Sequence, residues 1–206
     1  MSRISRRAVA AMLAVSTLLP GAAFAADAPK EIRIDWATYK VPVIVTRASN
    51  NYGPNQFPEK IIPLFITNLI DGLPVPLYGD GQNVRDWLHV EDHCRGVDML
   101  LEKSEPGEVY NIGGGNEVKN VDLTHRLLQL LDRPTSLITP VSDRPGHDRR
   151  YSLSTAKLQA LGWKPKHDFV AGLDKTVRWY IDNAPWIARV KSGAYREWLD
   201  KNYGTR

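Results

Sequence analysis

The sequence predicts an α/β or α+β domain, because short strand-like runs alternate with amphipathic helical stretches along most of its length. The 206 residues are 43% hydrophobic and 24% charged, an ordinary globular composition that suits one domain better than two. Proline and glycine occur at average frequency, which excludes collagen-like and low-complexity chains. We find no internal repeat in the sequence.

The net charge of +4 does not by itself indicate nucleic-acid binding. The first 25 residues contain three arginines and no acid, while the remainder holds 24 basic and 23 acidic residues. The excess positive charge is therefore a property of the first segment alone. We expect no nucleic-acid partner.

The first segment, residues 1–25, has the three parts of a secretory signal peptide. The basic start MSRISRR precedes the apolar run AVAAMLAVSTLL, and Ala23–Ala25 forms an A-x-A cleavage site. The run is shorter than the roughly 20 apolar residues that span a bilayer, so we expect no membrane association after the leader is removed. The leader predicts export to the periplasm, with the Sec and Tat routes both open. Cys94 is the only cysteine, so no internal disulfide is possible.

Residues 26–40 are expected to form a linker with one strand at Ile32–Trp36, where apolar and charged residues alternate. This segment resembles the mature start of periplasmic sulfonate- and taurine-binding proteins. The body of the chain, residues 41–206, has a different pattern.

The body begins with Val41–Thr46, a continuous run rich in β-branched residues that predicts a strand covered on both faces. The sequence also predicts a helix over 58–70, because Pro58 suits the start of a helix and Gly72 follows its end. Short strands are expected at Val75–Tyr78 and Val84–Val90, separated by a Gly-Asp-Gly turn.

The alternation continues to the end of the chain. The expected elements are a helix from Asp92 to Glu102, a strand at Val109–Ile112, a helix at Val121–Leu131 and a helix from Ser154 to Gly162. A last long helix begins at Asp168 and carries one apolar stripe, made of Leu173, Val177, Tyr180 and Ile181.

Three motifs suggest chemistry that their surroundings do not support. Ser154–Lys157 matches S-x-x-K, but the other β-lactamase elements are missing from the sequence, which favours a Ser helix cap. His89 and His93 are four residues apart, but a strand-to-helix junction would splay them, so we expect no metal site. Gly113–Gly115 lacks the G-x-G-x-x-G spacing and indicates a tight turn.

Two polar clusters have stronger claims to function. The first, Thr46–Pro54, directly follows the predicted buried strand and contains the adjacent amides Asn50 and Asn51. Ligands of open α/β sheets bind beyond the carboxyl ends of strands, so these amides are candidates to bind a polar ligand or a cofactor amide. The alternative is an Asx turn, which needs only one asparagine.

The second cluster, Asp143–Tyr151, places three arginines and a histidine around a Pro-Gly turn. Guanidinium groups pair bidentately with phosphate oxygens, so this cluster suits a diphosphate. The alternative is a solvated charge run whose arginines pair with its own acids. Arg85, in the middle of a predicted strand, is a further candidate for phosphate contact.

Four stretches carry a family resemblance. They read VIVTRASNNYGPNQFPEKIIPLFI, LYGDGQNVRDWLHVEDHCRG, GEVYNIGGGNE and DRPGHDRRYSLSTAKLQALGWKP. They resemble the dTDP-glucose 4,6-dehydratases of the extended short-chain dehydrogenase/reductase family, which use bound NAD. The resemblance runs from about Val41 to the C-terminus, roughly the second half of the family's length. It implies a partial NAD(P)-binding Rossmann-type fold, mainly its C-terminal α/β substrate lobe.

By this resemblance, a set of residues would hold a dTDP-sugar. Asn50 would contact the hexose, and Asn51 would touch the nicotinamide end of NAD. The other implied substrate contacts are Lys60 and Ile61 on the nucleotide side, Pro76, Leu77 and Tyr78 around the thymine, Arg85 and Asn111 at the diphosphate, and Asp143, Arg144, Pro145, Gly146 and His147 over the nucleotide.

The family's catalytic elements have no counterpart in these 206 residues. Its glycine-rich NAD loop, Thr-Asp-Glu element and Tyr-x-x-x-Lys pair lie upstream of the matching region, and no tyrosine here has a lysine four residues later. Oxidation of the sugar needs such a tyrosine, and NAD needs the missing βαβ unit. We therefore expect no catalytic residue, and a truncated chain in which an export leader is fused to a dehydratase C-terminal half.

Three functions remain open at this point. The chain is a dTDP-sugar-binding lobe without catalysis, an exported nucleotide-sugar-binding or interaction protein, or a lyase that is active only when a separate chain supplies the Rossmann half. The resembled family is cytoplasmic and homodimeric, and its dimer surface would be incomplete here. Because Val41–Thr46 would lack its neighbouring strands, we also expect poor solubility.

Overall fold

The computed structural model describes residues 38–143 and 145–193. Its strands are β1 Val45–Ala48, β2 Asn50–Tyr52, β3 Val75–Tyr78, β4 Val84–His89, β5 Val109–Ile112, β6 Glu117–Lys119 and β7 Ile138–Val141. Its helices are α2 Ile61–Ile70, α3 Val90–Lys103, α4 Asn120–Leu130, the 3₁₀ turn η2 Thr135–Leu137, α5 Ala156–Ala160, α6 Phe169–Asp182 and α7 Ala184–Lys191. The predicted leader, the strand at Ile32–Trp36 and Arg144 lie outside the described residues.

The strands form three small sheets with four ladders, of which three are parallel. β1 pairs with β5, β2 pairs with β4 and β3 pairs with β7, all in parallel, while β6 joins the other edge of β4 antiparallel. Parallel strands connected through helices confirm the α/β expectation.

The consecutive strands β1 and β2 link two of these ladders. Ser49 separates them, and its main-chain N–H donates to the Ile112 carbonyl at the end of β5, 3.0 Å away. β2 in turn pairs with β4, and Asn50 lies opposite Trp87 in that ladder. The polar segment from Ser49 to Tyr52 is therefore held by strands of two different sheets.

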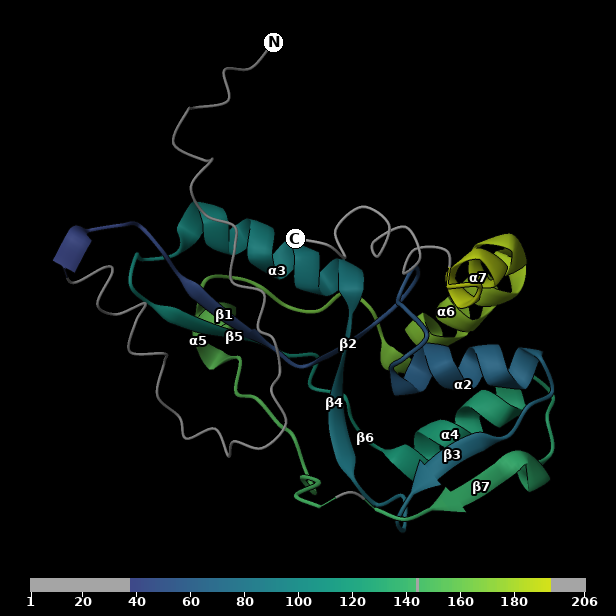
Figure 1. Ribbon diagram of the computed structural model, residues 1–206. Helices are drawn as coiled ribbons and strands as arrows, with labels where there is room; N and C mark the ends of the chain where they lie inside the picture. Colours follow the sequence, from purple (N-terminus) through teal and green to yellow (C-terminus); the bar gives the residue numbers. More distant parts are fainter. Residues whose placement is uncertain (1–37, 144, 194–206) are drawn as a thin grey trace, which may run out of the picture.

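Two apolar clusters form the core. Figure 1 shows α2, α4 and α6 on one side of β2 and β4, and α3, α5 and β5 on the other. The larger cluster gathers α2, α4 and α6 around residues such as Ile66, Leu127 and Leu173, all fully buried. The smaller one packs β5 against α3 and α5, with Trp163 at its centre. Among the described residues, no helix is long and apolar enough to cross a bilayer.

Several expected elements are confirmed. The strands at Val75–Tyr78 and Val109–Ile112 have the expected bounds. Asp168 caps α6, because its Oδ1 accepts a hydrogen bond from the Ala171 N–H at 3.0 Å.

Other expectations about these elements are wrong. The first strand is Val45–Ala48 rather than Val41–Thr46, and it alternates half-buried with exposed positions instead of being covered on both faces. The reason is that β1 pairs only with β5 among the described residues. Ile181 was placed on the buried stripe of α6 but is 50% exposed, since the helix turns it away from the core.

Two helix starts also differ from the prediction. α3 is capped by His89, whose side chain accepts from the Glu91 N–H, and not by Asp92. Asp92 is instead fully buried and binds the segment that precedes α6. α5 spans only Ala156–Ala160, and Ser154 does not cap it.

Candidate functional site

The loop around β2 contains buried acceptors without partners. Asn51 donates from Nδ2 to the Ser49 carbonyl at 3.1 Å, and Gln56 donates from Nε2 to the Asn51 carbonyl at 3.1 Å. The side-chain oxygens of Ser49, Asn51 and Gln56 are buried, and within the described residues they have no hydrogen-bond partner. Leaving such atoms unpaired is unfavourable, so this loop fits a ligand or water that donates hydrogen bonds.

Asn50 and Asn51 therefore have different surroundings. Asn51 makes the turn-like bond to Ser49, and its Oδ1 remains as a buried acceptor. Asn50 is half-buried on β2, opposite Trp87, whose indole N–H is another buried group without a partner in the described residues. Both amides are the first two residues of β2, so they lie inside a strand that follows β1 and not in a loop.

The pairing of β3 with β7 brings distant residues together. Tyr78 lies opposite Val141 in the ladder, and its ring meets His147 edge-on, with centroids 6.2 Å apart. His147 Nδ1 lies 2.6 Å from Asp143 Oδ1. Gly79 permits this approach, because a Cβ there would lie 3.1 Å from the Asp143 carboxylate. Tyr78, Asp143 and His147 thus form one group at the end of β3.

The neighbours of Tyr78 divide between two faces of β3. Pro76 is half-buried and Tyr78 is 46% exposed, whereas Leu77 is buried. The Leu77 side chain lies within reach of a Cβ built on Gly81, about 3.0 Å away. Leu77 therefore packs into the core, and only its main chain is on the side of Tyr78. Pro145 and Gly146 lie in the exposed turn between Asp143 and His147.

The arginines of this region have acidic or aromatic partners. Arg149 binds Asp80 through three hydrogen bonds of 2.8, 3.1 and 3.1 Å, and Arg150 binds Glu117 through two of 2.7 Å. These bonds hold the pKa of Asp80 below its usual range and that of Glu117 at about 2. Bidentate ion pairs with acids of other segments occupy both guanidinium forks, which makes these two arginines less available to a diphosphate than the sequence suggests.

Arg85 is held differently, although it too is fixed. Only 5% of Arg85 is exposed, and its Nη1 donates to the Val84 carbonyl at 2.8 Å. Its guanidinium carbon lies 4.4 Å from the centroid of the Tyr151 ring. This stacking keeps a cation in a fixed position on β4.

The remaining predicted contacts lie apart from one another. Asn111 is on β5, in a different ladder from Arg85, and donates from Nδ2 to the Ser154 carbonyl at 3.1 Å. Lys60 precedes α2 and its exposed ammonium lies 3.3 Å from Glu59, while Ile61 is the first residue of that helix and is half-buried.

The glycine run after β5 is a tight turn, as expected, and it is closed by a carboxylate. Asp86 accepts from the N–H groups of Gly114 and Asn116 at 3.0 and 2.7 Å. A Cβ on Gly114 would lie only 1.9 Å from the Trp87 carbonyl oxygen. Because Asp86 takes the position of an anion, this loop does not fit the pyrophosphate of NAD. The buried Asn51 Oδ1, like the side-chain oxygens of Ser49 and Gln56 in the same loop, is an acceptor that suits a carboxamide.

The S-x-x-K motif has a structural role. Lys157 Nζ pairs with Glu108 and donates to the Val109 carbonyl, and it lies 4.3 Å from the centroid of the Tyr110 ring. Through these contacts Lys157 links α5 to β5, and so to the smaller core cluster.

Sequence reasoning missed a histidine pair. His89 and His167 stack at 4.0 Å between ring centroids with 19° between the planes, and Glu91 lies beside them. Sequence spacing drew attention to His93, but the partner of His89 is distant along the chain. No local pattern marks such a pair, because the fold of the segment before α6 creates it.

Comparisons with known proteins agree with this geometry. The family model described as GDP-mannose 4,6 dehydratase matches residues 31–176. The chain is 49% identical over 195 residues to the dTDP-glucose 4,6-dehydratase of Salmonella typhimurium, covering 91% of the chain and 54% of that relative. It is 58% identical over 155 residues to the one of Streptomyces antibioticus, covering 75% of the chain and 46% of that relative.

Solved structures show the same likeness. The dTDP-glucose 4,6-dehydratase DesIV of Streptomyces venezuelae, solved with NAD and TYD bound, aligns with a TM-score of 0.76 at 50% identity, over 77% of this chain and 50% of that one. The UDP-glucose 4-epimerase of Thermus thermophilus, in complex with NAD, aligns with a TM-score of 0.70 at 28% identity, over 75% and 51% of the two chains. The expected partial, Rossmann-type extended short-chain dehydrogenase fold is thereby confirmed. The chain spans about half the length of the curated relatives it matches.

Proposed function

The chain belongs to the GDP-mannose 4,6 dehydratase family, and on that basis we propose that it binds a nucleoside diphosphate sugar, dTDP-glucose. The observation that carries this proposal is the grouping of Tyr78, His147 and Asp143 at the end of the β3–β7 ladder. Relatives whose names specify the same sugar nucleotide also support the proposal.

The base would stack on the exposed ring of Tyr78. This ring is 46% exposed and has His147 at its edge, so one of its faces can receive a planar pyrimidine. The hydrogen bond between His147 and Asp143 orients the imidazole beside that position. Pro76, on the same side of β3, adds apolar surface.

The diphosphate would be held by fewer cations than the sequence suggests. Arg149 and Arg150 are bound to acids, so they contribute little positive charge to a ligand. Arg85 is fixed over Tyr151 on β4, and by the family resemblance we assign it to the phosphates. The sugar would then extend toward Asn50, with the unpaired Asn51 Oδ1 beside it.

We further propose that these 206 residues do not oxidise the sugar by themselves. NAD, when bound, takes up a hydride from the sugar, and that step needs a tyrosine whose pKa is lowered by a nearby lysine. Burial instead raises the pKa of Tyr52, with the carboxylates of Asp168 and Asp92 adding to the shift, and burial also raises that of Tyr180. Both tyrosines are core residues with structural roles.

Calorimetry tests the binding proposal. We expect heat on titration of the full chain with dTDP-glucose and a loss of about tenfold or more in affinity for Tyr78→Ala, since base stacking contributes about 1–3 kcal/mol. Tyr39→Ala is the matched control, because Tyr39 is 71% exposed and lies outside the group. Absence of heat at millimolar ligand overturns the proposal.

A second function, an exported nucleotide-sugar-binding or interaction protein, is favoured by the leader-like residues 1–25. Mass spectrometry of the protein from the periplasmic fraction would then find a chain that begins at Ala26. An uncleaved chain confined to the cytoplasm contradicts export.

A third function is a lyase that a separate Rossmann half completes. In that case dTDP-glucose is turned over with added NAD only when that half is present.

A further inference from the structure

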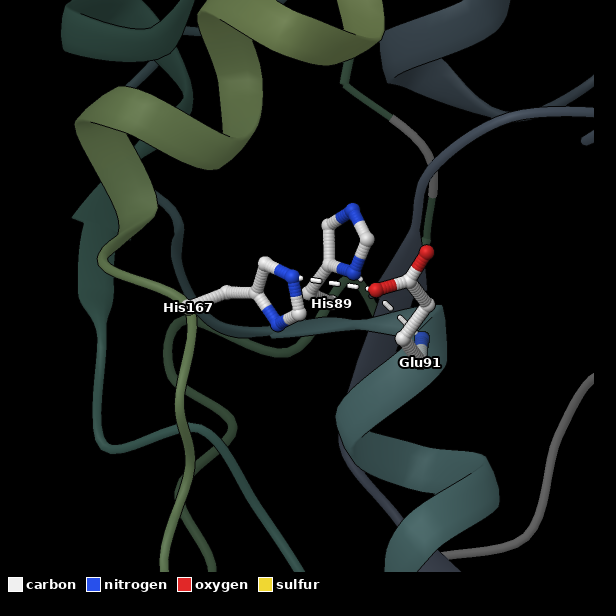
Figure 2. Close-up of side chains that lie close together, drawn as sticks. All are labelled: His89, Glu91 and His167. Atoms are coloured by element: carbon white, nitrogen blue, oxygen red, sulfur yellow. Dashed lines mark hydrogen bonds and ion pairs between the residues drawn. The ribbon is translucent and has the colours of Figure 1, made fainter.

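His89, Glu91 and His167, here called the histidine cluster, lie where α3 begins and where the chain enters α6. Each offers one ligand atom, and these atoms lie within 4.8 Å of one another. Figure 2 shows the two rings face to face, with the Glu91 carboxylate beside them. None of the three belongs to the proposed nucleotide site, so their role is independent of it.

His167 has the proton arrangement of a metal ligand. Its Nδ1 lies 3.0 Å from Asp92 Oδ2, and its Nε2 lies 3.1 Å from Glu91 Oε2. Since Asp92 is a buried carboxylate that only accepts, Nδ1 donates to it, and Nε2 is the ring nitrogen left for an ion placed between His167 and Glu91. A carboxylate that orients a histidine in this way is the usual outer partner of a metal-bound imidazole.

Asp92 is itself held in place by other hydrogen bonds. It is fully buried and accepts from the main-chain N–H groups of Lys166 and His167 at 3.0 and 2.9 Å. Arg95 donates to its Oδ1 at 2.6 Å.

His89 has its lone pair on Nδ1. This nitrogen accepts a long hydrogen bond of 3.3 Å from the Glu91 N–H, which an ion bound at Nδ1 would replace, and only 6% of the residue is exposed. Glu91 adds an anionic oxygen whose side chain is 67% exposed, so water can reach a further coordination position.

We propose that the histidine cluster is a divalent transition-metal site that binds Zn²⁺ through His89, Glu91 and His167. The distance of 3.1 Å between His167 Nε2 and Glu91 Oε2 is near the roughly 3.3 Å between two ligands at about 2.0 Å from a tetrahedral ion. Imidazole and carboxylate are ligands that zinc accepts, and two carboxylates balance the charge of the ion.

Binding turns the two rings out of their stack, because stacked imidazoles direct their lone pairs in parallel. His167 is the ring that moves, since its side chain is 21% exposed and that of His89 is buried. The ion would join the start of α3 to the segment before α6. The expectation of no metal site considered His93 as the partner of His89, and the fold supplies His167 instead.

The test uses the full chain stripped with a chelator and then titrated with Zn²⁺ by calorimetry and with Co²⁺ by visible absorption. We expect one ion per chain, intensified d–d bands of cobalt, and a higher melting temperature with zinc. Glu91→Gln and His167→Gln each weaken zinc binding by at least about tenfold. Even the loss of a residue that only orients a metal ligand has an effect of this size. The Glu91 side chain is exposed and that of His167 is partly exposed, and circular dichroism establishes that both variants fold.

His125→Gln and His93→Gln are the matched controls. His125 is exposed on α4, and His93 lies on α3 outside the cluster, so both variants keep the affinity of the parent chain. Zinc binding that survives Glu91→Gln and His167→Gln unchanged overturns the proposal. So does a parent chain that gives neither heat with zinc nor the cobalt bands.

Discussion

Asp92 Oδ2 accepts two hydrogen bonds from His167, one from the main-chain N–H at 2.9 Å and one from Nδ1 at 3.0 Å. The two residues belong to segments far apart in the sequence, and this double contact joins the first turn of α3 to the segment that leads into α6. A fully buried carboxylate in this position serves both the packing of the domain and the orientation of the histidine cluster.

Replacing this carboxylate should destabilise the domain. Asp92→Ala leaves the N–H groups of Lys166 and His167 buried without an acceptor, and we expect the free energy of unfolding to fall by about 2–3 kcal/mol. Urea unfolding followed by circular dichroism measures this. Asp98→Ala, at an exposed position of the same helix, should change it by less than about 0.5 kcal/mol. Equal effects of the two variants would contradict a structural role for Asp92.

Close packing at the glycine turn should make Gly114 irreplaceable. In Gly114→Ala the added methyl would lie 1.9 Å from a main-chain oxygen, which a side-chain rotation cannot relieve. We expect a loss of about 3 kcal/mol or more in the free energy of unfolding. Gly115→Ala meets nothing within 4 Å but has φ of +69°, so it should lose only about 1–2 kcal/mol. A Gly114→Ala variant as stable as Gly115→Ala would show that the turn can open.

Stability should decrease with acid near pH 6. Burial lowers the pKa of His89 and of His93, and for His89 the neighbouring His167 adds to the shift while Glu91 and Asp92 oppose it. The unfolded chain therefore takes up protons first, so the stabilisation is present above pH about 6.5 and is lost as the pH falls through the lowered folded values.

Urea unfolding between pH 7.5 and 5.5 measures this dependence while most carboxylates stay ionised. His93→Gln should make the decrease shallower, and His125→Gln, at an exposed histidine, should leave it unchanged. A stability that is flat across this range would refute the prediction.

The open edges of the first strands should limit solubility. Among the described residues β1 pairs only with β5 and β2 pairs only with β4, so each has one edge without a described strand. Unpaired edges next to apolar residues favour intermolecular pairing, and we expect the isolated chain to elute as large assemblies in size-exclusion chromatography. A monodisperse monomer with one cooperative melting transition would argue against this prediction.

Most of the local structure could be predicted from the sequence. β3 and β5 were predicted at their observed bounds because β-branched and apolar runs between turn residues depend only on neighbouring positions. The cap of α6 by Asp168 is local for the same reason. The start of α3 was misplaced, since Asp92 has the residue type of a cap but is drawn into the core by Lys166 and His167.

The candidate site was only partly predictable. The amides of β2 were found because they follow a strand end, and the family resemblance then suggested the residues around Tyr78. The partners of the arginines could not be read from the sequence, because Arg149 meets Asp80 and Arg150 meets Glu117 across the pairing of separate segments. These ion pairs make Arg149 and Arg150 less available to a diphosphate than the sequence suggests.

The sequence by itself determined the alternation of strands and helices, the family and the absence of a Tyr-x-x-x-Lys pair from these residues. Tertiary structure alone decided that His89 meets His167, that Asp86 closes the glycine turn, and that Tyr78 meets His147. The physical reason is that propensity and periodicity act over a few residues, whereas these contacts depend on which distant segments pack together.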